Sequence, residues 1–195
     1  MRANRVMATR WRWHTVLRAG VLLAAISACA SKPATKDFTL TDHTGQPFSL
    51  ASQRGKVVML FFGYTMCPDV CPTTLSKLTT VTARLGADRA QVKTVYVTVD
   101  PARDSPAVLK ADLDLFDLDA VGLTGTREAI DKVVAMYGAT YEITPTPNSA
   151  AKYSVAHSTT LYIIDQDGII RREFPYEATA DEIVAAIRPL LAAPR

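Results

Sequence analysis

Acidic residues and long apolar runs are both missing from the N-terminal part of the chain. The first 28 residues contain five Arg and no Asp or Glu. The apolar stretch at residues 19–28 falls well short of the roughly 20 residues that cross a bilayer. A basic segment, a short apolar segment and small residues, in that order, are typical of a secretory signal. We therefore expect residues 1–28 to be a signal peptide and the mature protein to be exported.

The end of this segment, Ile26 to Cys29, resembles the bacterial lipobox. Such a motif implies cleavage before Cys29 and attachment of lipid to its sulfur. Residues 29–36 would then form a lipidated tether. The domain of residues 37–193 would face the periplasm or the cell exterior from a bacterial membrane. The alternative is an uncleaved membrane anchor, because apolar residues continue on the other side of Arg18.

Basic clusters are missing from the rest of the chain. The whole sequence has a formal net charge of +3, and removing the five Arg of the first 28 residues leaves −2. The positive net charge of the chain therefore comes from the predicted signal peptide. No cluster of Lys and Arg with interleaved aromatic residues follows, so we expect no nucleic acid as a partner. The 167 residues from 29 to 195 suit one domain with a sizeable core.

Cysteine is scarce as well. With Cys29 assigned to lipid, the mature chain holds only Cys67 and Cys71, in the run FFGYTMCPDVCPTTL. Two thiols exclude the dense disulfide framework on which small exported domains depend. A bridge between them would close a loop of only a few residues and remove little entropy from the unfolded chain. A purely structural disulfide would therefore stabilise the fold weakly, and we assign these thiols to chemistry.

Apolar runs of strand length alternate with segments of helical periodicity, which is typical of an α/β fold. The expected strands form a hairpin around 42–45, buried strands at 57–62, 92–99 and 120–123, and a second hairpin at 161–164 and 169–174. The expected helices span 72–85, 105–116, 128–137 and a last segment that follows a capping box at Thr179 and Glu182. Residues 142–156 contain Pro145, Pro147 and Asn148 and are expected to be a loop.

The thiols follow a buried strand and precede a helix. Pro72 suits the first position of that helix, so Cys71 lies at the helix start and Cys67 just before it. Open α/β sheets bind ligands at the carboxyl ends of their strands, and the positive end of a helix dipole favours thiolate. Thiolate both binds metals and attacks disulfides, so the placement alone leaves both chemistries open.

The spacing favours a metal. Redox dithiols usually read C-x-x-C, whereas this chain has C-x-x-x-C. Two thiolates and a neutral imidazole make a compact site for Cu(I), and imidazole also accepts Cu(II). Zinc is the rival metal, although a structural zinc site normally closes with four ligands. Besides the thiols, the mature chain offers His43 and His157, with Met59 and Met66 as weaker options.

His157 lies far along the chain, in the run YSVAHSTTLYIID. A lone histidine before a strand is more often a structural residue than a ligand. However, a loop that enters a strand next to the strand bearing the thiols can lie over the thiol loop. His43 falls in the first predicted hairpin turn, where we expect a surface residue. His157 is therefore the candidate third ligand.

Four motifs in order, G-Y-T-x-C-P-D-V-C-P-T, T-V-D-P-A-R-D-S-P, G-L-T-G-T and A-H-S-T-T-L-Y-I-I-D, resemble those of the SCO/SenC family. The resemblance covers about residues 37–190, and the agreement of four separate motifs makes it specific. It implies a thioredoxin-like fold with a central mixed sheet, helices on both faces and an N-terminal β-hairpin. Members of the family are copper-binding assembly factors for the dinuclear CuA centre in subunit II of cytochrome c oxidase.

The resemblance also implies roles for individual residues. Cys67, Cys71 and His157 match the family's copper ligands, so copper is the expected cofactor. Cytochrome c oxidase subunit II, or its assembly factors, is the expected partner. Asp100, the acid of the D-P-x-R-D motif, would lie near the site and aid metal or partner engagement. An Asp before Pro at a strand end is equally typical of a turn.

Two further residues belong to the thiol loop. Asp69, with Pro68, would shape the chain between the two cysteines. Tyr64 would cover the site. Both are expected to contact the metal environment or the partner and not the metal itself.

The main alternative is a thiol-disulfide oxidoreductase that reduces the cysteines of the oxidase subunit. It needs Cys67 and Cys71 as a redox-active disulfide but does not need His157. Thioredoxin-like oxidoreductases resemble one another in a cis-proline that faces the dithiol, and here that approach contains His157 and no proline. A copper sensor that acts through a partner is a third reading. A peroxidase is disfavoured, because the segment from Cys67 to Cys71 contains no Arg.

Overall fold

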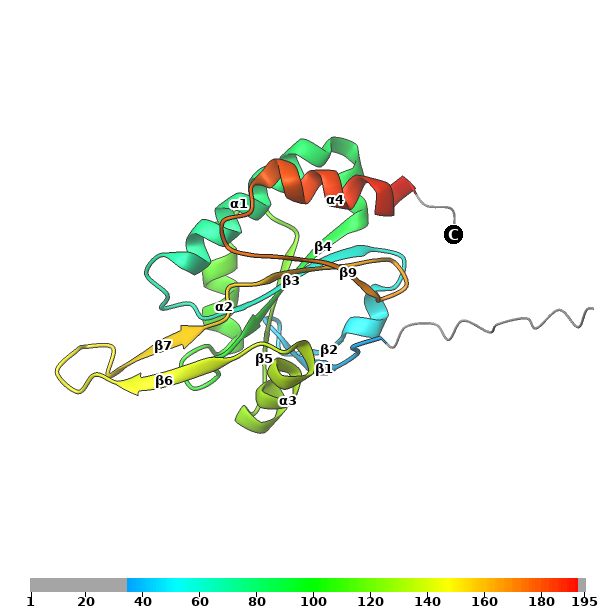
Figure 1. The fold of residues 1–195 in the computed structure, drawn as a ribbon. Helices are drawn as coiled ribbons and strands as arrows, with labels where there is room; N and C mark the ends of the chain where they lie inside the picture. Colours follow the sequence, from blue (N-terminus) through cyan, green and yellow to red (C-terminus); the bar gives the residue numbers. More distant parts are fainter. Residues whose placement is uncertain (1–34, 193–195) are drawn as a thin grey trace, which may run out of the picture. The chain divides into compact units, whose positions relative to one another are not determined.

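A mixed sheet of seven strands forms the centre of the domain, in the order β2-β1-β5-β4-β3-β8-β9 (Figure 1). The computed structural model describes residues 35–192. The strands are β1 (Thr39–Asp42), β2 (Pro47–Ser49), β3 (Val57–Gly63), β4 (Val92–Thr98), β5 (Ala120–Thr124), β6 (Tyr141–Pro145), β7 (Tyr153–His157), β8 (Leu161–Ile164) and β9 (Ile170–Phe174). The helices are α1 (Val70–Leu85), α2 (Pro106–Leu113), α3 (Arg127–Tyr137) and α4 (Ala180–Ala192), with 3-10 turns η1 (Leu50–Gln53) and η2 (Gly86–Gln91).

The three central strands are parallel, and the outer ones are antiparallel. β4 pairs with β3 on one side and with β5 on the other, both in parallel. All seven residues of β3 are buried, which explains why its sequence is a continuous apolar run without alternation. β8 and β9 add to the free side of β3 as an antiparallel hairpin, and β1 adds antiparallel to β5. The predicted mixed sheet and N-terminal hairpin are thus confirmed.

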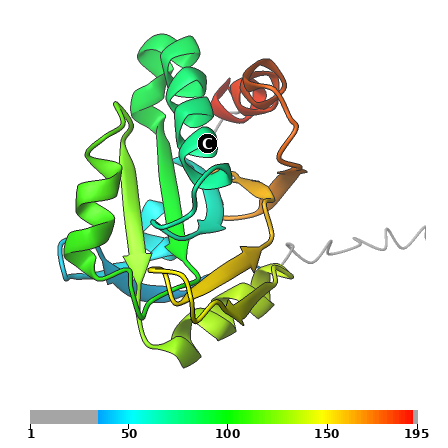
Figure 2. The ribbon, with the colours of Figure 1, turned by 90° about the vertical axis from the view of Figure 1, so that its left-hand side faces the viewer.

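Helices cover both faces of the sheet, as the sequence predicts. One face packs against α1, α2 and α4 through apolar side chains such as Leu78, Leu109 and Ile187. The other face packs against α3 through Ile130 and Tyr137. Figure 2 shows α1 and α4 side by side on their shared face. Because both faces of β3 are covered, the strand that leads to the thiols is rigidly held.

Capping residues set the ends of most helices. Ser105 accepts a hydrogen bond from the Val108 amide at the start of α2, and Thr126 does the same for α3. Thr179 and Glu182 form the predicted capping box of α4. Two boundaries differ from expectation. α2 ends at Leu113 and not at 116, and α1 begins at Val70, two residues before Pro72. Proline is still tolerated there, because the first four amides of a helix have no partner within it.

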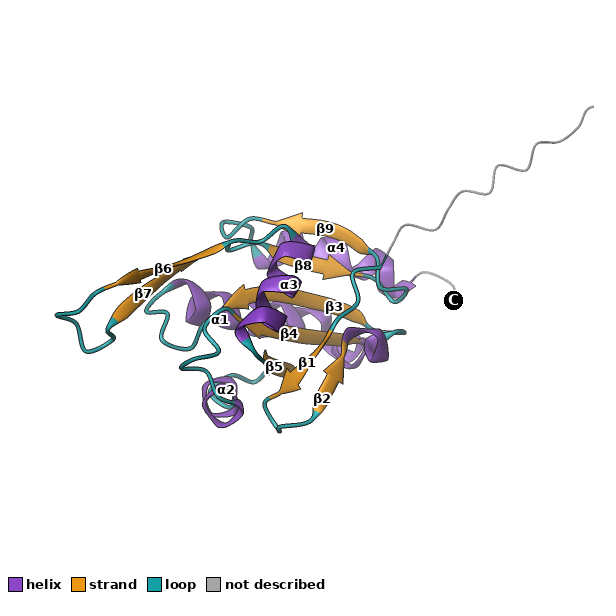
Figure 3. Ribbon diagram, turned by 90° about the horizontal axis from the view of Figure 1, so that it is seen from below, coloured by secondary structure: helices purple, strands orange, loops and turns teal. Residues whose placement is uncertain are grey.

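The prediction of a loop at 142–156 is wrong. Residues 141–145 and 153–157 form an antiparallel hairpin, β6–β7, that extends away from the sheet (Figure 3). The prolines fall at its end and in its turn, and only Val155 of the ten strand residues is buried. Apolar residues do alternate in both short strands, but the prolines and Asn148 between them are typical of a loop and outweighed that signal. His157 is therefore the last residue of a strand and not part of a long loop.

Several predictions concern residues that the structure does not describe. The signal peptide at 1–28, Cys29 and most of the tether at 29–36 lie outside residues 35–192. Within that range, none of the helices has the length and apolar character needed to span a membrane.

Candidate metal centre

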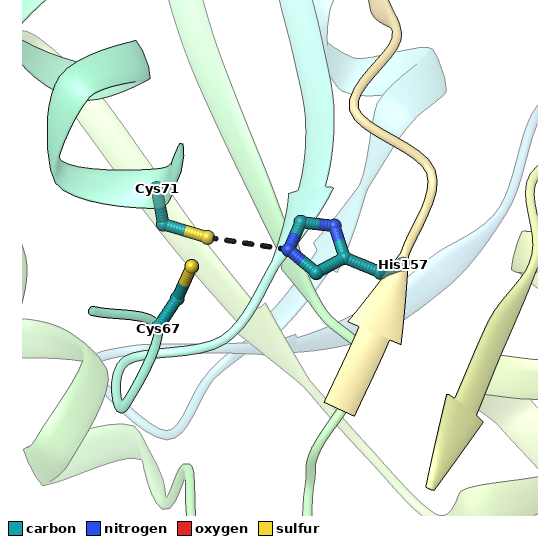
Figure 4. A group of neighbouring side chains, drawn as sticks. All are labelled: Cys67, Cys71 and His157. Atoms are coloured by element: carbon teal, nitrogen blue, oxygen red, sulfur yellow. Dashed lines mark hydrogen bonds between the residues drawn. The ribbon is translucent and has the colours of Figure 1, made fainter. Parts of the chain in front are cut away.

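Two cysteines and one histidine meet at the carboxyl end of β3. The sulfurs of Cys67 and Cys71 and a ring nitrogen of His157 all lie within 4.8 Å of one another. Cys71 Sγ is 3.6 Å from His157 Nε2, and all three side chains point toward a common centre (Figure 4). The thiols come from the β3–α1 connection and the first turn of α1, and the imidazole comes from the end of β7. The structure thus brings together the three residues that the sequence singled out.

A buried carboxylate holds the start of the thiol loop. Asp104 accepts hydrogen bonds from the Thr65 amide (3.1 Å), the Thr65 hydroxyl (2.6 Å) and the Thr98 hydroxyl (2.5 Å). Farther along the loop, the Cys67 amide donates to the Tyr64 carbonyl at 3.1 Å. Burial raises the pKa of Asp104, and its three donors oppose that rise. The loop is therefore tied to the end of β4, which places Cys67 opposite Cys71.

Gly63, the last residue of β3, leaves room for the Cys71 sulfur. A Cβ atom at this position would lie 2.6 Å from Cys71 Sγ and 2.7 Å from Cε2 of Tyr96. Both distances are too short for any side chain, so glycine is required here for close packing. The Tyr96 ring in turn stacks on Phe61, with centroids 4.8 Å apart and planes 9° apart.

The two thiols differ in exposure. Both are free cysteines, Cys67 half-buried and Cys71 buried. Burial raises the pKa of the Cys71 thiol well above its usual value, while the Tyr64 backbone and the nearby Tyr96 hydroxyl act in the opposite direction. For Cys71, burial therefore outweighs the expected preference of the helix start for thiolate. In the metal-free protein Cys71 is a protonated thiol.

His157 is a neutral imidazole of defined tautomer. Its Nδ1 lies 2.9 Å from the Ser158 carbonyl, which can only accept, so Nδ1 carries the proton. Nε2 therefore presents its lone pair to Cys71 Sγ. Burial lowers the pKa of His157, against the effect of the Ser158 carbonyl, and keeps the ring neutral near pH 7. The ring also meets the Tyr64 ring edge-on, with centroids 5.7 Å apart, so Tyr64 borders the site.

Asp100 holds the hairpin that carries His157. This carboxylate is fully buried and accepts hydrogen bonds from the Tyr153 hydroxyl (2.8 Å) and from Arg103 Nε. The Arg103 guanidinium lies 3.8 Å from the centre of the Tyr153 ring and also donates to the carbonyls of Ala151 and Tyr153. We call Asp100, Arg103 and Tyr153 the hairpin clamp. Asp100 thus contacts the hairpin and does not belong to the group of three possible ligands.

The remaining candidate residues, Asp69, Met66 and His43, do not belong to the group of three. Asp69 is exposed at the N-cap position of α1, with its Oδ1 3.4 Å from the Thr73 hydroxyl. Met66 is 51% exposed. His43 is half-buried and not on the surface as expected, because its Nδ1 accepts a hydrogen bond of 3.0 Å from the Gly122 amide. That position, between β1 and β5, lies outside the group of three.

Sequence reasoning missed four residues of the site's support. Arg103 and Asp104 lie within the quoted T-V-D-P-A-R-D-S-P motif, so a signal for them existed. Tyr153 and Tyr96 had none, because their roles depend on contacts between distant segments. Among residues 35–192 no fourth Cys, His, Asp or Glu joins the group of three. The donor set fits a soft ion such as Cu(I) better than the four-ligand structural site of zinc.

Comparison with known sequences assigns the chain to a family. The sequence model of SCO1/SenC matches residues 27–192. The chain belongs to the SCO1/SenC family. It is 37% identical over 159 residues to the mitochondrial protein SCO2 homolog of Mus musculus, covering 80% of this chain and 62% of that protein. It is 39% identical over 133 residues to a putative copper-binding protein of Stutzerimonas stutzeri, covering 68% of this chain and 64% of that protein.

Solved SCO structures share the fold. Bradyrhizobium japonicum ScoI with copper bound superposes with a TM-score of 0.73 at 35% identity, covering 80% of this chain and 98% of that one. A SCO1/SenC family lipoprotein from Bacillus anthracis has a TM-score of 0.68 at 26% identity, with 79% and 92% covered. BsSco, described as having a disulfide switch and as a member of the Sco family of cytochrome c oxidase assembly proteins, has a TM-score of 0.63 at 25% identity, with 81% and 93% covered.

Proposed function

We propose that this SCO1/SenC protein is a copper chaperone that helps to assemble the CuA centre of cytochrome c oxidase. The observation that carries the proposal is the group of two sulfurs and one neutral imidazole within 4.8 Å. Thiolates and imidazole are the ligands that Cu(I) prefers, and imidazole also accepts Cu(II). Copper in the related ScoI structure supports the ion, and the description of BsSco as a member of a family of cytochrome c oxidase assembly proteins supports the oxidase as the target. Within it, subunit II or its assembly factors would be the partner.

The three residues around the ligands would serve in different ways. Asp100 would act through the hairpin clamp, which fixes the strand bearing His157. Tyr64 would shield the imidazole, against which its ring packs edge-on. Asp69 is an exposed residue of the thiol loop, at the N-cap position of α1, so it would contact the partner and not the metal.

The proposal includes a membrane tether. Residues 1–28 would be a lipoprotein signal peptide, Cys29 would carry lipid, and residues 29–36 would connect it to the domain of residues 37–193. The lipoprotein among the structural neighbours supports this arrangement. The domain would then lie in the periplasm or outside the cell, close to a membrane-bound oxidase. Globomycin-sensitive processing and a lipid mass on Cys29 would test it, and an intact N-terminus in the membrane fraction would contradict it.

Copper titration of single variants tests the site. His157→Ala removes the nitrogen ligand and should weaken binding of Cu(I) and Cu(II) and change the Cu(II) spectrum. His43→Ala is the matched control, because His43 is also a half-buried imidazole but lies outside the group. Binding by the wild type should weaken at low pH, since the thiols must lose protons to bind. Unchanged affinity and spectrum in His157→Ala would reject the three-ligand site.

A thiol-disulfide oxidoreductase is the second candidate, favoured by the two free thiols side by side and by the disulfide switch ascribed to BsSco. An oxidase assay in a deletion strain separates the two functions. Copper delivery requires His157, so wild type should rescue and His157→Ala should not. A reductase needs only Cys67 and Cys71, so equal rescue by both proteins would favour it. A reductase would also need a reduction potential for the Cys67–Cys71 couple well below the redox potential of its compartment.

A further inference from the structure

Tyr96 is a buried tyrosine whose hydroxyl has no hydrogen-bond partner. It lies in the middle of β4, the strand next to β3, and its side chain is fully buried. Among residues 35–192 its hydroxyl makes no hydrogen bond of full geometry, although it is close enough to the Cys71 sulfur to affect the pKa of that thiol. An unpaired buried hydroxyl is costly, and phenylalanine would fill the same space without that cost. The stability of the fold therefore does not explain why this residue is tyrosine and not phenylalanine.

The unpaired hydroxyl lies beside Cys71. A Cβ atom built on Gly63 would lie 2.6 Å from Cys71 Sγ and 3.2 Å from the Tyr96 hydroxyl oxygen. Both atoms therefore border the same small space above Gly63. The stack on Phe61 fixes the plane of the Tyr96 ring, so the hydroxyl cannot turn toward another acceptor.

The sulfur changes as an acceptor when it binds a metal. A neutral thiol accepts hydrogen bonds weakly, whereas a thiolate carries negative charge and accepts strongly. Cys71 is buried, and of the two thiols it has the less access to water. A donor within the protein would have to take the place of water at this sulfur.

We propose that Tyr96 is a positioning residue whose hydroxyl donates a hydrogen bond to the Cys71 sulfur in its copper-bound thiolate form. This inference rests on the proposed copper site. In the metal-free protein the hydroxyl makes no hydrogen bond of full geometry, because the neutral thiol is a poor acceptor. The bond to sulfur forms fully when copper takes the place of the thiol proton. The hydrogen bond stabilises charge on the buried sulfur and lowers the energy of its lone pairs.

The test is Tyr96→Phe, titrated with Cu(I) and with Cu(II). A hydrogen bond to a charged group is worth enough that its loss should raise the Kd for copper by about tenfold. The sulfur-to-copper charge-transfer band of the Cu(II) protein should move to longer wavelength, because the sulfur electrons are less stabilised. The metal-free variant should melt at the same temperature as wild type or higher, since only an unpaired hydroxyl is lost.

Tyr162→Phe is the matched control. Its hydroxyl is also buried, but it donates to the Tyr137 carbonyl at 3.1 Å. Removing it leaves that carbonyl unpaired, so this variant should melt at a lower temperature while its copper affinity and spectrum stay as in wild type.

The outcomes separate the two proposals. If wild type binds copper and Tyr96→Phe has the same Kd and the same band, the assignment of Tyr96 is wrong and the copper site stands. If the band moves equally in Tyr162→Phe, the effect is general loosening and the assignment is also wrong. If wild type itself binds no copper, the proposed function fails and the role of Tyr96 fails with it.

Discussion

At the scale of single residues, burial and not charge sets the state of the site. Cys71 and His157 contact each other, and burial disfavours the charged form of both, so the pair rests as a neutral thiol and a neutral imidazole. A carbonyl fixes the tautomer of His157 and leaves one nitrogen free to bind a metal. A metal-free site of this kind is ready for a cation, because its imidazole needs to lose no proton.

The neutral state of His157 predicts how stability depends on pH. Its pKa in the folded protein lies below the ordinary value of 6.5, so the unfolded chain binds more protons between the two values. The free energy of unfolding of the metal-free protein should therefore fall as the pH drops below 6.5 and level off below the folded pKa. Thermal melts from about pH 7.5 to about pH 5 measure this fall.

His157→Gln should melt with a smaller loss over the same range, because glutamine does not titrate. His43→Gln is the control. It should keep the pH-dependent loss of stability that comes from His157 and lack only the separate contribution of His43, whose pKa is also lowered by burial. Identical pH profiles for wild type and His157→Gln would contradict this account.

At the scale of elements, the hairpin that carries His157 is held near both of its ends. Its two strands are anchored by two arginines. Arg103 stacks on Tyr153 of β7, and Arg127 donates to the hydroxyl of Tyr141 on β6 at 2.8 Å. The Tyr141 contact lies where β6 pairs with His157, and the Tyr153 contact lies at the other end, where Tyr153 pairs with Pro145 beside the turn. The hairpin itself projects from the sheet (Figure 3). The candidate ligand His157, at the end of β7, thus owes its position to side chains outside the group of three.

Arg103→Lys should loosen this hairpin. Lysine keeps the charge beside the buried Asp100 but loses the planar fork and the stacking on Tyr153. We expect the free energy of unfolding to fall by on the order of 2 kcal/mol. Amide exchange in residues 153–157 should accelerate, and copper should dissociate faster. Hydrogen exchange by mass spectrometry and stopped-flow transfer of copper to a chelator measure the two effects.

Arg171→Lys is the control for this variant. Arg171 also donates through Nε to a carboxylate, that of Asp165 at 2.6 Å, but it is 47% exposed and lies on the β8–β9 side. An exposed pair contributes little, so the control should behave as wild type. Equal exchange rates in the hairpin of both variants would show that the clamp does not hold β7.

At the scale of the whole molecule, ligands from separate segments link metal binding to folding. Cys67, Cys71 and His157 meet only in the folded domain, so copper bound at the proposed site would favour the native state over the unfolded chain. Free copper at about 100 times its Kd should add about 2.7 kcal/mol to the free energy of unfolding. For a domain of this size that corresponds to a rise in Tm of about 5–10 °C.

Removal of the metal should reverse this rise. A Cu(I) chelator added to the loaded protein should return the Tm to its metal-free value. Cys71→Ser lacks one proposed ligand, so copper should raise its Tm much less. Lys110→Gln changes an exposed residue, so copper should raise its Tm as much as in wild type. A copper-dependent rise of the same size in Cys71→Ser would place the metal elsewhere.

Sequence reasoning succeeded where local pattern and packing agree. The continuous apolar run of β3, the caps at Ser105 and Thr126, and the capping box of α4 each follow from neighbours in the chain. It failed for β6 and β7, because two strands of only five residues give a weak alternation that the prolines and Asn148 around their turn outweighed. It also misjudged Cys71, since the depth of burial at a helix start depends on what packs over it.

The amino-acid sequence by itself determined the α/β order, the spacing of the two thiols and the identity of the third candidate ligand, because these depend on residues close together or on motifs. Only the tertiary structure decided that His157 reaches the sulfurs, that Asp100 contacts the hairpin that carries His157, and that the Tyr96 hydroxyl lies beside Cys71 without a hydrogen bond of full geometry. The physical reason is that each of these is a contact of a few ångströms between segments far apart in the chain, fixed by packing and not by local preference.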